Sequence, residues 1–424
     1  MTDGITIVLG AGAVLDFEHK GIFPSVKNIS EEVLKISTPK VDGGERLLIK
    51  DLNDCITTRL KQVGNSQGRR YLHPEVNFEE LLYVLEMCIS YSSCWHDEYL
   101  HWKAFPLFGT LVNSTPSLKD ISTIEYEGAA RTLMERVMEI VNQYDSMFRK
   151  DRNSERWYRE FWRSMKGANI FSLNYDYTIE DSVESYEDGF ENISEEDDYF
   201  RFSARKYYEN PDRKPTIAHL HGCILYSEAR SFPFEYSTRD LVKNKDYETA
   251  LKNRIVSQIV PRTQTKEMYM QPYIISGMRK IEKMVVMPYG VYLSDLTRSV
   301  LKNKKLMIIG YSFGDLYLNE ILGLGIAAHG DEFKVVIIDK FPPNVHDYLS
   351  FYQELTRLGM FNFVSRVSRS RLSIEAGQKD FPFEVKDYVT PVISMNGNVM
   401  ICMTGFKDAV TKHMEEINAF FSNK

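Results

Sequence analysis

The feature that most constrains the fold is the stretch ITIVLGAGA, residues 5–13, close to the start of the chain. Five apolar or β-branched residues run directly into small ones, which is typical of a strand buried on both faces that turns tightly into a helix. Gly10 and Gly12 would let the backbone approach a pyrophosphate, and the N–H groups at the start of that helix would face it. Taken alone, the stretch fits a nucleotide site and a plain core strand with a small-residue turn equally well.

The same stretch departs from the dinucleotide-binding fingerprint of ordinary dehydrogenases. That fingerprint has a third glycine three residues after the second, where this chain has Leu15. It also has a second strand that ends in an acidic residue about 20 residues further on. Because the chain has neither feature, an ordinary dehydrogenase is not favoured.

Length and composition restrict the remaining classes. The chain has 424 residues, more than a single core usually holds, so more than one lobe is expected. A net charge of -7 gives no general electrostatic reason to bind nucleic acid. Polar residues follow Met1 and no apolar run reaches the ~18 residues of a membrane span, so we expect a cytoplasmic protein without a signal peptide or membrane contact.

The cysteine pattern predicts thiols rather than disulfides or a metal. The five cysteines are scattered and odd in number, and no CxxC pair occurs. A metal site at Cys88, Cys94 and His96 is the alternative, but this spacing fits no common zinc site. No metal is therefore expected.

Residues 28–166 have apolar side chains spaced three and four apart, which predicts amphipathic helices. The stripes are Ile29, Val33, Leu34 and Ile36; Phe78, Leu81, Leu82, Leu85 and Ile89; and Leu133, Val137, Ile140 and Val141. We interpret this region as a helical lobe inserted into an α/β domain. Its aromatic cluster, Tyr91, Trp95, Tyr99 and Trp102, is expected to form core or an oligomer contact, with a stacking platform for bases as the alternative.

Outside that lobe, four short apolar segments are predicted to be buried strands with polar or small residues at their ends. They span 168–173, 216–220, 305–309 and 333–338, and are followed by Asn174-Tyr175-Asp176, by His221, by residues 310–315 and by Asp339. Strands that alternate with helices form parallel sheets, and such sheets bind ligands at the carboxyl ends of their strands. The acidic run between Glu180 and Asp198 is expected to be a solvated loop.

The C-terminal segment has a different pattern. Asn396-Gly397 between two apolar runs predicts a hairpin, because this pair tolerates positive φ angles, and residues 406–421 predict an amphipathic helix. The expected architecture is thus an α/β domain with a Rossmann-like parallel sheet in two segments, 1–27 and 167–345. A helical insertion, 28–166, and an α+β extension, 346–424, complete it.

Five motifs, taken in order, resemble the series that marks the sirtuin-like superfamily. They are Leu9-Gly10-Ala11-Gly12-Ala13, Gly21-Ile22-Phe23-Pro24, Leu173-Asn174-Tyr175-Asp176, Leu220-His221-Gly222 and Ile309-Gly310-Tyr311-Ser312-Phe313-Gly314-Asp315. Their order and their places at successive strand ends are far more specific than any one of them. The resemblance covers residues 5 to about 340, and the chain looks like the bacterial sirtuin-domain proteins of anti-phage defence, which cleave NAD+ when infection is sensed.

This resemblance implies a role for each motif. Asn174 with Asp176 would act at the nicotinamide ribose, and His221 would be the catalytic base. The expected contacts to NAD+ are Gly10, Ala11, Gly12 and Ala13 at the pyrophosphate, Phe23 and Pro24 beside it, Gly310, Tyr311 and Ser312 at the adenosine half, and Asp339 at the end of the next strand. Deacylating sirtuins carry a CxxC…CxxC zinc module that this chain lacks, so water is the expected acceptor.

The residue types suit that chemistry on physical grounds. Breaking the nicotinamide–ribose bond passes through a cationic sugar and needs a positioned nucleophile. The amide of Asn174 can orient a water and the ribose hydroxyls, and His221 can exchange a proton near neutral pH. The alternatives are a cap or turn residue for Asn174 and a core histidine for His221. His219 is expected to be structural, and Asp176 to orient a neighbour or balance charge.

The leading hypothesis is a hydrolase that converts NAD+, as its substrate, to nicotinamide and ADP-ribose, and that stays silent until a partner or ligand signals infection. The alternatives are a catalytically silent subunit that binds NAD+ or ADP-ribose and an ADP-ribosyltransferase. The helical insertion predicts a homo-oligomer or a complex with a second defence subunit, such as a helicase-type ATPase or a nucleotide-sensing protein. A monomer whose insertion only thickens the core is the alternative.

Overall fold

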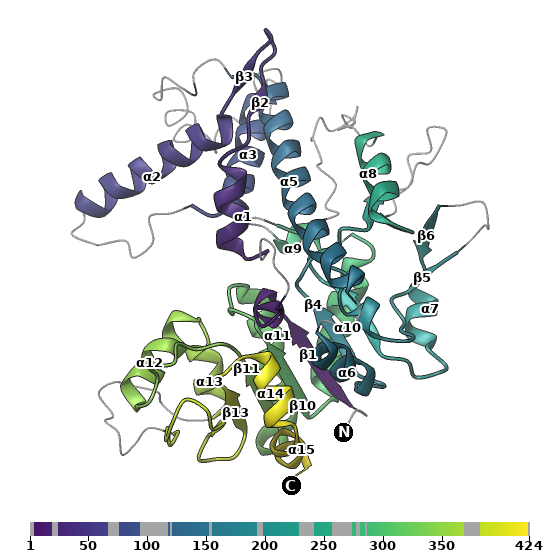
Figure 1. Ribbon diagram of the computed structural model, residues 1–424, viewed down its shortest axis with the longest axis vertical. Coiled ribbons are helices and arrows are strands. Elements are labelled where there is room, and N and C mark those ends of the chain that lie inside the picture. The colour runs from purple at the N-terminus through teal and green to yellow at the C-terminus, as the bar shows by residue number, and fades with distance from the viewer. Residues whose placement is uncertain are drawn as a thin grey trace. The chain divides into compact units, whose positions relative to one another are not determined.

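The computed structural model describes residues 4–18, 24–66, 76–93, 118, 121–151, 155–192, 198–228, 241–256, 274–276, 280–284, 286–368 and 382–422. The chain forms two compact units (Figure 1). The first contains Met1–Gly21, Asp145–Asn253 and Met284–Lys424, and the second contains Ile22–Tyr144 and Arg254–Lys283. Compared with the division predicted from the sequence, the helical unit takes in residues 254–283, whereas residues 145–166 and the residues after 345 belong to the first unit.

A seven-stranded sheet in the order β12-β13-β11-β10-β1-β4-β7 forms the centre of the first unit. Its strands are β1 (Ile5–Leu9), β4 (Asn169–Ser172), β7 (Thr216–His219), β10 (Lys305–Ile309), β11 (Lys334–Ile338), β12 (Val392–Ile393) and β13 (Val399–Cys402). All neighbouring strands are parallel except β12 and β13. The predicted α/β fold with a Rossmann-like parallel sheet is therefore confirmed.

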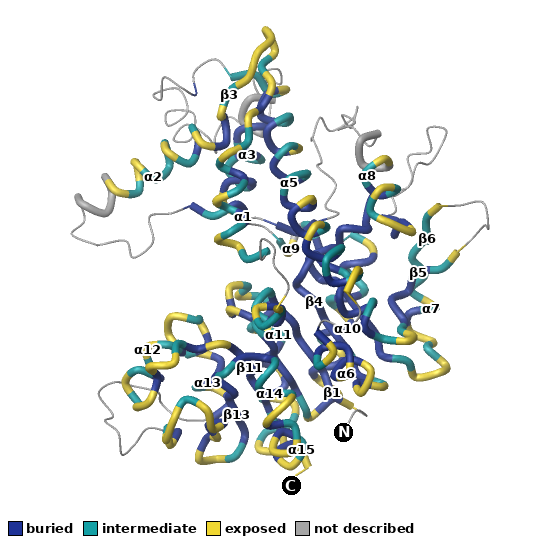
Figure 2. Tube along the Cα trace, in the orientation of Figure 1, coloured by how far each residue is buried: buried dark blue, intermediate teal, exposed yellow. Residues whose placement is uncertain are grey.

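Strand β1 lies in the middle of this sheet, between β10 and β4. Its residues are all buried, as expected for a strand covered on both faces (Figure 2). The chain builds the sheet outward from β1 to β4 and β7, and then returns to the other side of β1 to add β10 and β11. The order therefore reverses between β1 and β10, and in open α/β sheets ligands bind at the carboxyl ends of the strands beside such a reversal.

Helices connect and cover the strands of the first unit. They are η1 (Ala11–Val14), α6 (Arg156–Ser164), η4 (Glu180–Ser182), α7 (Ala204–Glu209), α10 (Tyr289–Lys302), α11 (Leu316–His329), η5 (Gly330–Glu332), α12 (Tyr348–Arg357), α13 (Phe361–Val367), α14 (Phe406–Lys412) and α15 (Met414–Ser422). Helix α10 contacts β1, β4, β7 and α11. The ring of Phe406 on α14 packs edge-on against Trp157 and Phe161 of α6, with centroids 5.3 and 4.9 Å away.

A second, antiparallel sheet of four strands also belongs to the first unit, in the order β5-β6-β9-β8. Its strands are β5 (Phe190–Glu191), β6 (Tyr199–Phe202), β8 (Tyr226–Glu228) and β9 (Leu241–Asn244). The described part of the acidic run leading into it is not a solvated loop throughout, because Glu180, Glu187 and Asp188 are buried. Oδ2 of Asp188 lies 2.5 Å from Nζ of Lys243. Lys243 lies outside the acidic run, so the pattern of the run does not predict this ion pair.

The predicted C-terminal hairpin is confirmed. β12 and β13 are antiparallel, and Gly397 has a φ of +67°, which an Asn-Gly turn accommodates. In addition, β13 pairs with β11 in parallel, so that the hairpin extends the central sheet instead of standing beside it. The predicted closing helix is divided into α14 and α15 at His413.

The second unit is mainly helical, as predicted. Its elements are α1 (Val26–Val33), α2 (Leu48–Ser66), α3 (Phe78–Ser93), α9 (Lys280–Lys283) and the short strands β2 (Thr38–Pro39) and β3 (Glu45–Arg46), while α5 (Thr123–Lys150) and α8 (Tyr247–Val256) continue from one unit into the other. The apolar stripes of α3 and α5 are buried. In the described part of the chain, no helix is long and apolar enough to cross a membrane. Trp95, Tyr99 and Trp102 of the aromatic cluster lie outside the described residues, as does the side chain of Tyr91.

Candidate functional site

The candidate site is at the carboxyl ends of β10, β1, β4 and β7, where four of the five sequence motifs begin. Leu9 pairs in register with both Ile309 and Ser172, and Ser172 pairs with His219. The residues that follow these strands therefore leave the sheet at one level. The remaining motif is Gly21-Ile22-Phe23-Pro24. Its first three residues lie outside the described residues, and Pro24 is half-buried.

The turn after β1 packs directly against the turn after β10. A Cβ atom on Gly10 would lie 2.5 Å from the carbonyl oxygen of Gly310, and one on Gly12 would lie 2.7 Å from its Cα. Gly310 itself has a φ of +59°. Contacts this close exclude a side chain, so the three glycines allow two backbone turns to meet at the reversal of the sheet.

The helix expected after the glycines is a single 3-10 turn, η1, which ends at Val14. The N–H of Gly12 donates to the carbonyl of Gly310 at 2.9 Å, and that of Ala13 donates to the carbonyl of Gly10 at 3.1 Å. These two donors are thus used within the protein. The expected contact of residues 10–13 with a pyrophosphate stays a prediction.

Asn174 has a fixed backbone and an available side chain. Its N–H donates to Oγ of Ser172 at 3.1 Å, and its carbonyl accepts from Nδ1 of His219 at 3.1 Å. The residue is only 7% exposed. Its side-chain Nδ2 is buried without a hydrogen-bond partner among the described residues. An amide donor left unpaired in the interior is costly, and this one lies where the fold places ligands.

His219 is held between Asn174 and Glu180, a residue that we did not single out from the sequence. Its Nε2 lies 2.6 Å from Oε1 of Glu180, and both side chains are buried. Because a carbonyl can only accept, Nδ1 carries a proton toward Asn174, and a doubly protonated ring satisfies both neighbours. Burial works to lower the pKa of His219, but the Glu180 carboxylate and the Asn174 carbonyl raise it above its usual range.

Asp176 is also buried, and its contacts are within its own turn. Its Oδ1 accepts from the N–H of Thr178 at 3.1 Å and from the hydroxyl of Thr178 at 2.6 Å. Burial raises the pKa of Asp176, against these two hydrogen bonds. The contacts give Asp176 a part in shaping the segment that carries Asn174, and its direct catalytic role stays a prediction.

His221 is 5% exposed and faces Asp315. Asp315 is the last residue of the fifth sequence motif, but we did not predict it as a site residue. Nε2 of His221 lies 3.4 Å from Oδ2 of Asp315. The N–H of Asp315 donates to the hydroxyl of Tyr311 at 3.1 Å, and that hydroxyl lies 3.0 Å from Oδ1 of Asn319 on α11. Tyr311, expected to contact the adenosine half of NAD+, thus holds the turn that presents Asp315.

The remaining predicted contacts differ in their surroundings. Asp339 follows β11, whose last residue Ile338 pairs with Ile309, and therefore lies at the same edge of the sheet. It is buried, and burial raises its pKa to about 6, although its Oδ1 accepts from the N–H of Lys340 at 2.7 Å. Ser312 is exposed.

Comparison with known families identifies this region. The SIR2-like domain family matches residues 168–355, from the start of β4 into α12. The chain carries a sirtuin-like domain. This match includes Asn174, His221 and Asp315, whereas β1 and its glycine turn lie before it in the sequence. Among curated proteins, none matches the chain in a sequence comparison.

A sirtuin-like fold is compatible with NAD-related activity, and such domains are often enzymes that use NAD+. Within the part of the chain that the structure describes, no group of three or more His, Cys, Asp or Glu side chains is arranged to hold a metal ion. Cys94 and His96 of the alternative metal site lie outside that part.

Proposed function

We propose that the sirtuin-like domain hydrolyses NAD+ to nicotinamide and ADP-ribose. The observation that supports this most directly is the buried, unpaired Nδ2 of Asn174 beside the segment that carries His221. Asn174 and His221 each lie two residues beyond a register pair, Ser172 and His219, of the adjacent strands β4 and β7. An amide donor and an imidazole are thus presented together at the ligand-binding edge of a Rossmann-like sheet.

The unpaired amide supports a polar ligand rather than a packed core at this point. A buried donor without an acceptor costs roughly 1–3 kcal/mol, which a hydroxyl of the substrate or a bound water would recover. The backbone of Asn174 is held on both sides by Ser172 and His219, so its side chain needs little rearrangement to bind such a ligand. Ribose hydroxyls and the attacking water are acceptors of suitable size.

The proposed reaction breaks the bond between nicotinamide and C1′ of the ribose. Nicotinamide leaves with the bonding electrons, and the oxygen of a water molecule forms the new bond to C1′. The proton released by this water passes to His221, and the carboxylate of Asp315 stabilises the imidazolium that forms. NAD+ and water are thereby converted to nicotinamide, ADP-ribose and a proton.

Product analysis of purified protein with NAD+ tests this proposal. Hydrolysis gives equal amounts of nicotinamide and free ADP-ribose. Transfer gives nicotinamide and an ADP-ribosylated acceptor that mass spectrometry detects. Binding without the release of nicotinamide, under all activating conditions tried, would favour the silent regulatory subunit and contradict the proposal.

We also propose that the protein acts as a bacterial anti-phage effector that depletes NAD+ after infection. The series of five motifs resembles that of the defence sirtuins, and this resemblance is the support. Bacteria that express the chain should lose NAD+ and stop growing upon phage challenge, and should release fewer phage. Cells that express an Asn174→Ala variant should keep their NAD+ and should not be protected.

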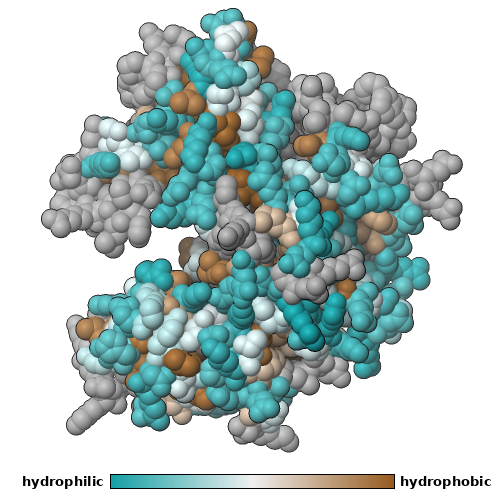
Figure 3. All heavy atoms as spheres, viewed as in Figure 1, coloured by the Kyte–Doolittle hydropathy of each residue, from teal (hydrophilic) through white to brown (hydrophobic). Residues whose placement is uncertain are grey.

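Assembly through the second unit is a separate proposal. Among the described residues of this unit, the large apolar side chains that are at least 40% exposed are Val26, Val41, Leu47, Ile124 and Ile281. Figure 3 shows apolar (brown) atoms among the hydrophilic (teal) atoms of the molecular surface. Exposed apolar groups on several elements favour a homo-oligomer or a complex with a second defence subunit. Light scattering across a dilution series tests this, and a monomer mass at micromolar concentration with and without a partner would contradict it.

A further inference from the structure

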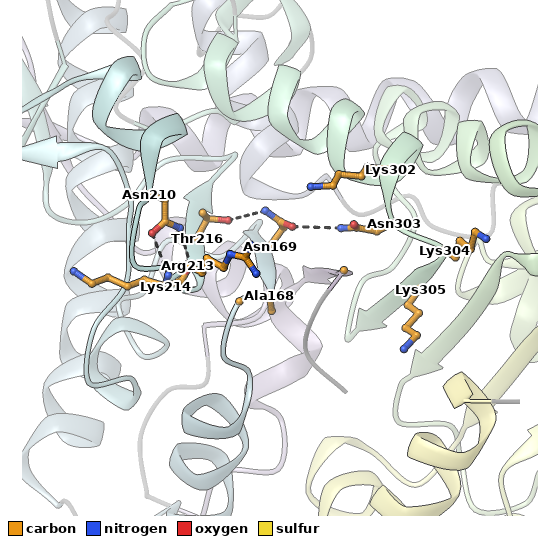
Figure 4. Close-up of a pocket in the computed structure, with 12 residues that line it drawn as sticks. Ala168, Asn169, Asn210, Arg213, Lys214, Thr216, Lys302, Asn303, Lys304 and Lys305 are labelled. Atoms are coloured by element: carbon orange, nitrogen blue, oxygen red, sulfur yellow. Dashed lines mark hydrogen bonds between the residues drawn. The ribbon is translucent and has the colours of Figure 1, made fainter.

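A pocket of about 680 Å³ lies at the amino ends of β1, β4, β7 and β10, at the edge of the sheet opposite to the candidate active site (Figure 4). Five of the residues that line it are cationic and none is acidic: Arg213, Lys214, Lys302, Lys304 and Lys305. Strands of four or five residues at about 3.3 Å per residue separate the two sites by roughly 15 Å. The pocket is therefore distinct from the site that contains Asn174 and His221.

Three of these cations have no carboxylate partner in the part of the chain that the structure describes. Lys214 pairs with Asp212 at 3.2 Å, and Lys304 pairs with Glu332. In contrast, Arg213, Lys302 and Lys305 have no carboxylate within 4.0 Å in the described ranges. Several unpaired cations in one concave site create a positive local potential, although the chain as a whole has a net charge of -7.

The floor of the pocket is polar and fixed. Nδ2 of Asn303, a buried residue, donates to the hydroxyl of Thr6 at 3.1 Å and to Oδ1 of Asn169 at 3.3 Å. Nδ2 of Asn169 donates in turn to the hydroxyl of Thr216 at 3.1 Å (Figure 4). These hydrogen bonds join the starts of β1, β4 and β7 to the end of α10, so the cationic side chains stand around a rigid base.

Arg213 is held in an unusual backbone conformation. Its φ is +48°, a left-handed value that residues other than glycine rarely adopt. Asn210 secures the turn, because its Nδ2 donates to the carbonyl of Lys214 at 2.7 Å and its Oδ1 accepts from the N–H of Lys214 at 3.0 Å. Figure 4 shows the side chain of Arg213 extending toward Asn169. Strain of this kind is commonly found at ligand sites.

We propose that this pocket binds a small anion with a chain of two or more phosphate groups. The planar guanidinium of Arg213 can form two hydrogen bonds to one phosphate, while Lys302 and Lys305 provide point charges for its neighbours. The volume is within the range of ordinary ligand sites and accommodates an inorganic oligophosphate or a nucleoside polyphosphate. The phosphate chain is the chemistry that the two ligands share.

Isothermal titration calorimetry on the full chain tests the proposal without any need for NAD+ turnover. Tripolyphosphate, adenosine triphosphate, adenosine and sulfate are titrated separately at low ionic strength. We expect saturable binding of both phosphate compounds at or below about 1 mM and no binding of adenosine. Adenosine triphosphate that binds about tenfold tighter than tripolyphosphate identifies a nucleotide, and equal affinities identify the phosphate chain alone. Absence of saturable binding, or sulfate that binds equally well, would overturn the proposal.

A matched pair of triple variants assigns the binding to this pocket. One variant combines Arg213→Gln, Lys302→Gln and Lys305→Gln. The other combines Arg156→Gln, Arg205→Gln and Lys412→Gln, which remove the same charge from exposed positions of the first unit outside the pocket. Circular dichroism verifies that both are folded.

We expect the pocket variant to bind tripolyphosphate at least about tenfold more weakly, and the control variant to change by less than about twofold. An Asn174→Ala variant should bind it as the unmodified chain does, because that residue belongs to the other edge of the sheet. Equal weakening in the two triple variants would mean that overall charge and not the pocket attracts the anion. Weakening by Asn174→Ala would move the binding to the candidate active site, and either result would refute the inference.

Discussion

Nε2 of His221 lies 3.4 Å from Oδ2 of Asp315, although the strands that precede them, β7 and β10, are separated in the sheet by β1 and β4. At about 4.8 Å per strand, the ends of β7 and β10 are about 14 Å apart. The two turns therefore extend toward each other above the carboxyl ends of β1 and β4. The pair marks the part of the edge where we expect the nicotinamide ribose to bind.

The first prediction concerns the two proposed catalytic side chains. Asn174→Ala and His221→Ala should each lower NAD+ hydrolysis by about 100-fold or more, the contribution expected of a group that acts in proton transfer or in positioning water. Both residues follow strands and do not form the core, so the melting temperature should change little. Asn344→Ala and His346→Ala, at exposed positions, are matched controls. Retention of more than a tenth of the rate by both site variants would contradict the assignment.

Asp315→Asn should lower NAD+ hydrolysis less than the Asn174 and His221 variants do. The variant keeps the shape of the side chain but removes the anion 3.4 Å from Nε2 of His221. Because the imidazolium that forms during the reaction loses this neighbour, we expect a loss of about tenfold in kcat at neutral pH. A kcat equal to that of the unmodified chain would contradict the proposed role of Asp315.

Glu180→Gln should destabilise the protein most at low pH. The pKa of His219 is raised in the folded state, so the contribution of its charged form is fully present below about pH 6.5 and is lost as pH rises through the folded-state value. Removal of one partner from a buried pair costs about 3 kcal/mol. Urea unfolding of the variant and the unmodified chain should thus differ more at pH 6 than at pH 9. A difference that grows with pH would contradict the proposed protonation of His219.

Asp339→Asn should stabilise the protein at alkaline pH. Burial raises the pKa of this carboxyl from 3.8 to about 6, so ionisation opposes folding, with no cost below pH 3.8 and the full cost above pH 6. Asparagine keeps an oxygen for the N–H of Lys340 and cannot ionise. The expected gain in the free energy of unfolding is about 3 kcal/mol at pH 8 and close to zero at pH 4. Equal stability of the two proteins at pH 8 would show that Asp339 is not desolvated.

Gly310→Ala should destabilise the fold more than an alanine placed at another glycine with positive φ. A Cβ atom at Gly310 would overlap the backbone of Gly12 and Ala13, in addition to the strain of φ +59°. At Gly44, with φ +88°, a Cβ atom meets nothing within 4 Å. Thermal unfolding should show a loss of about 1 kcal/mol for Gly44→Ala and at least 3 kcal/mol for Gly310→Ala. Similar losses would mean that the two turns do not need to pack so closely.

Local pattern was sufficient to predict the strands of the central sheet and the edge at which the motif residues gather. Short apolar runs followed by Asn174 or His221 carry this information, because parallel strands end at one edge. The partners of these residues were not predictable in the same way. Glu180 lies in an acidic run typical of a solvated loop and forms part of η4, whereas its partner His219 is on β7. The pairing of Asp315 with His221 depends on the path of two turns, which no periodicity encodes.

The hairpin was predicted for a local reason and its place in the sheet was not. Asn396-Gly397 predicts a tight connection between two strands because glycine tolerates a positive φ, and Gly397 has a φ of +67°. The pairing of β13 with β11, in contrast, joins segments that are far apart in sequence. Any buried surface could cover the apolar side chains of β13. The pairing of β13 with β11 therefore depends on the complete fold and not on the local sequence.

The central position of β1 has a consequence for how the molecule is made. Thr6 pairs with Asn169, and Ile5 with Lys305, so this apolar strand is synthesised long before β4 and β10 and has no neighbour in the sheet until they follow. Such long-range pairing slows folding and leaves a strand that can associate with other chains. A fragment cut at the boundaries of the matched region, 168–355, would lack this strand and bring β10 and β4 together across a missing centre. Expression for biochemistry should therefore retain the first residues of the chain and proceed slowly, at low temperature.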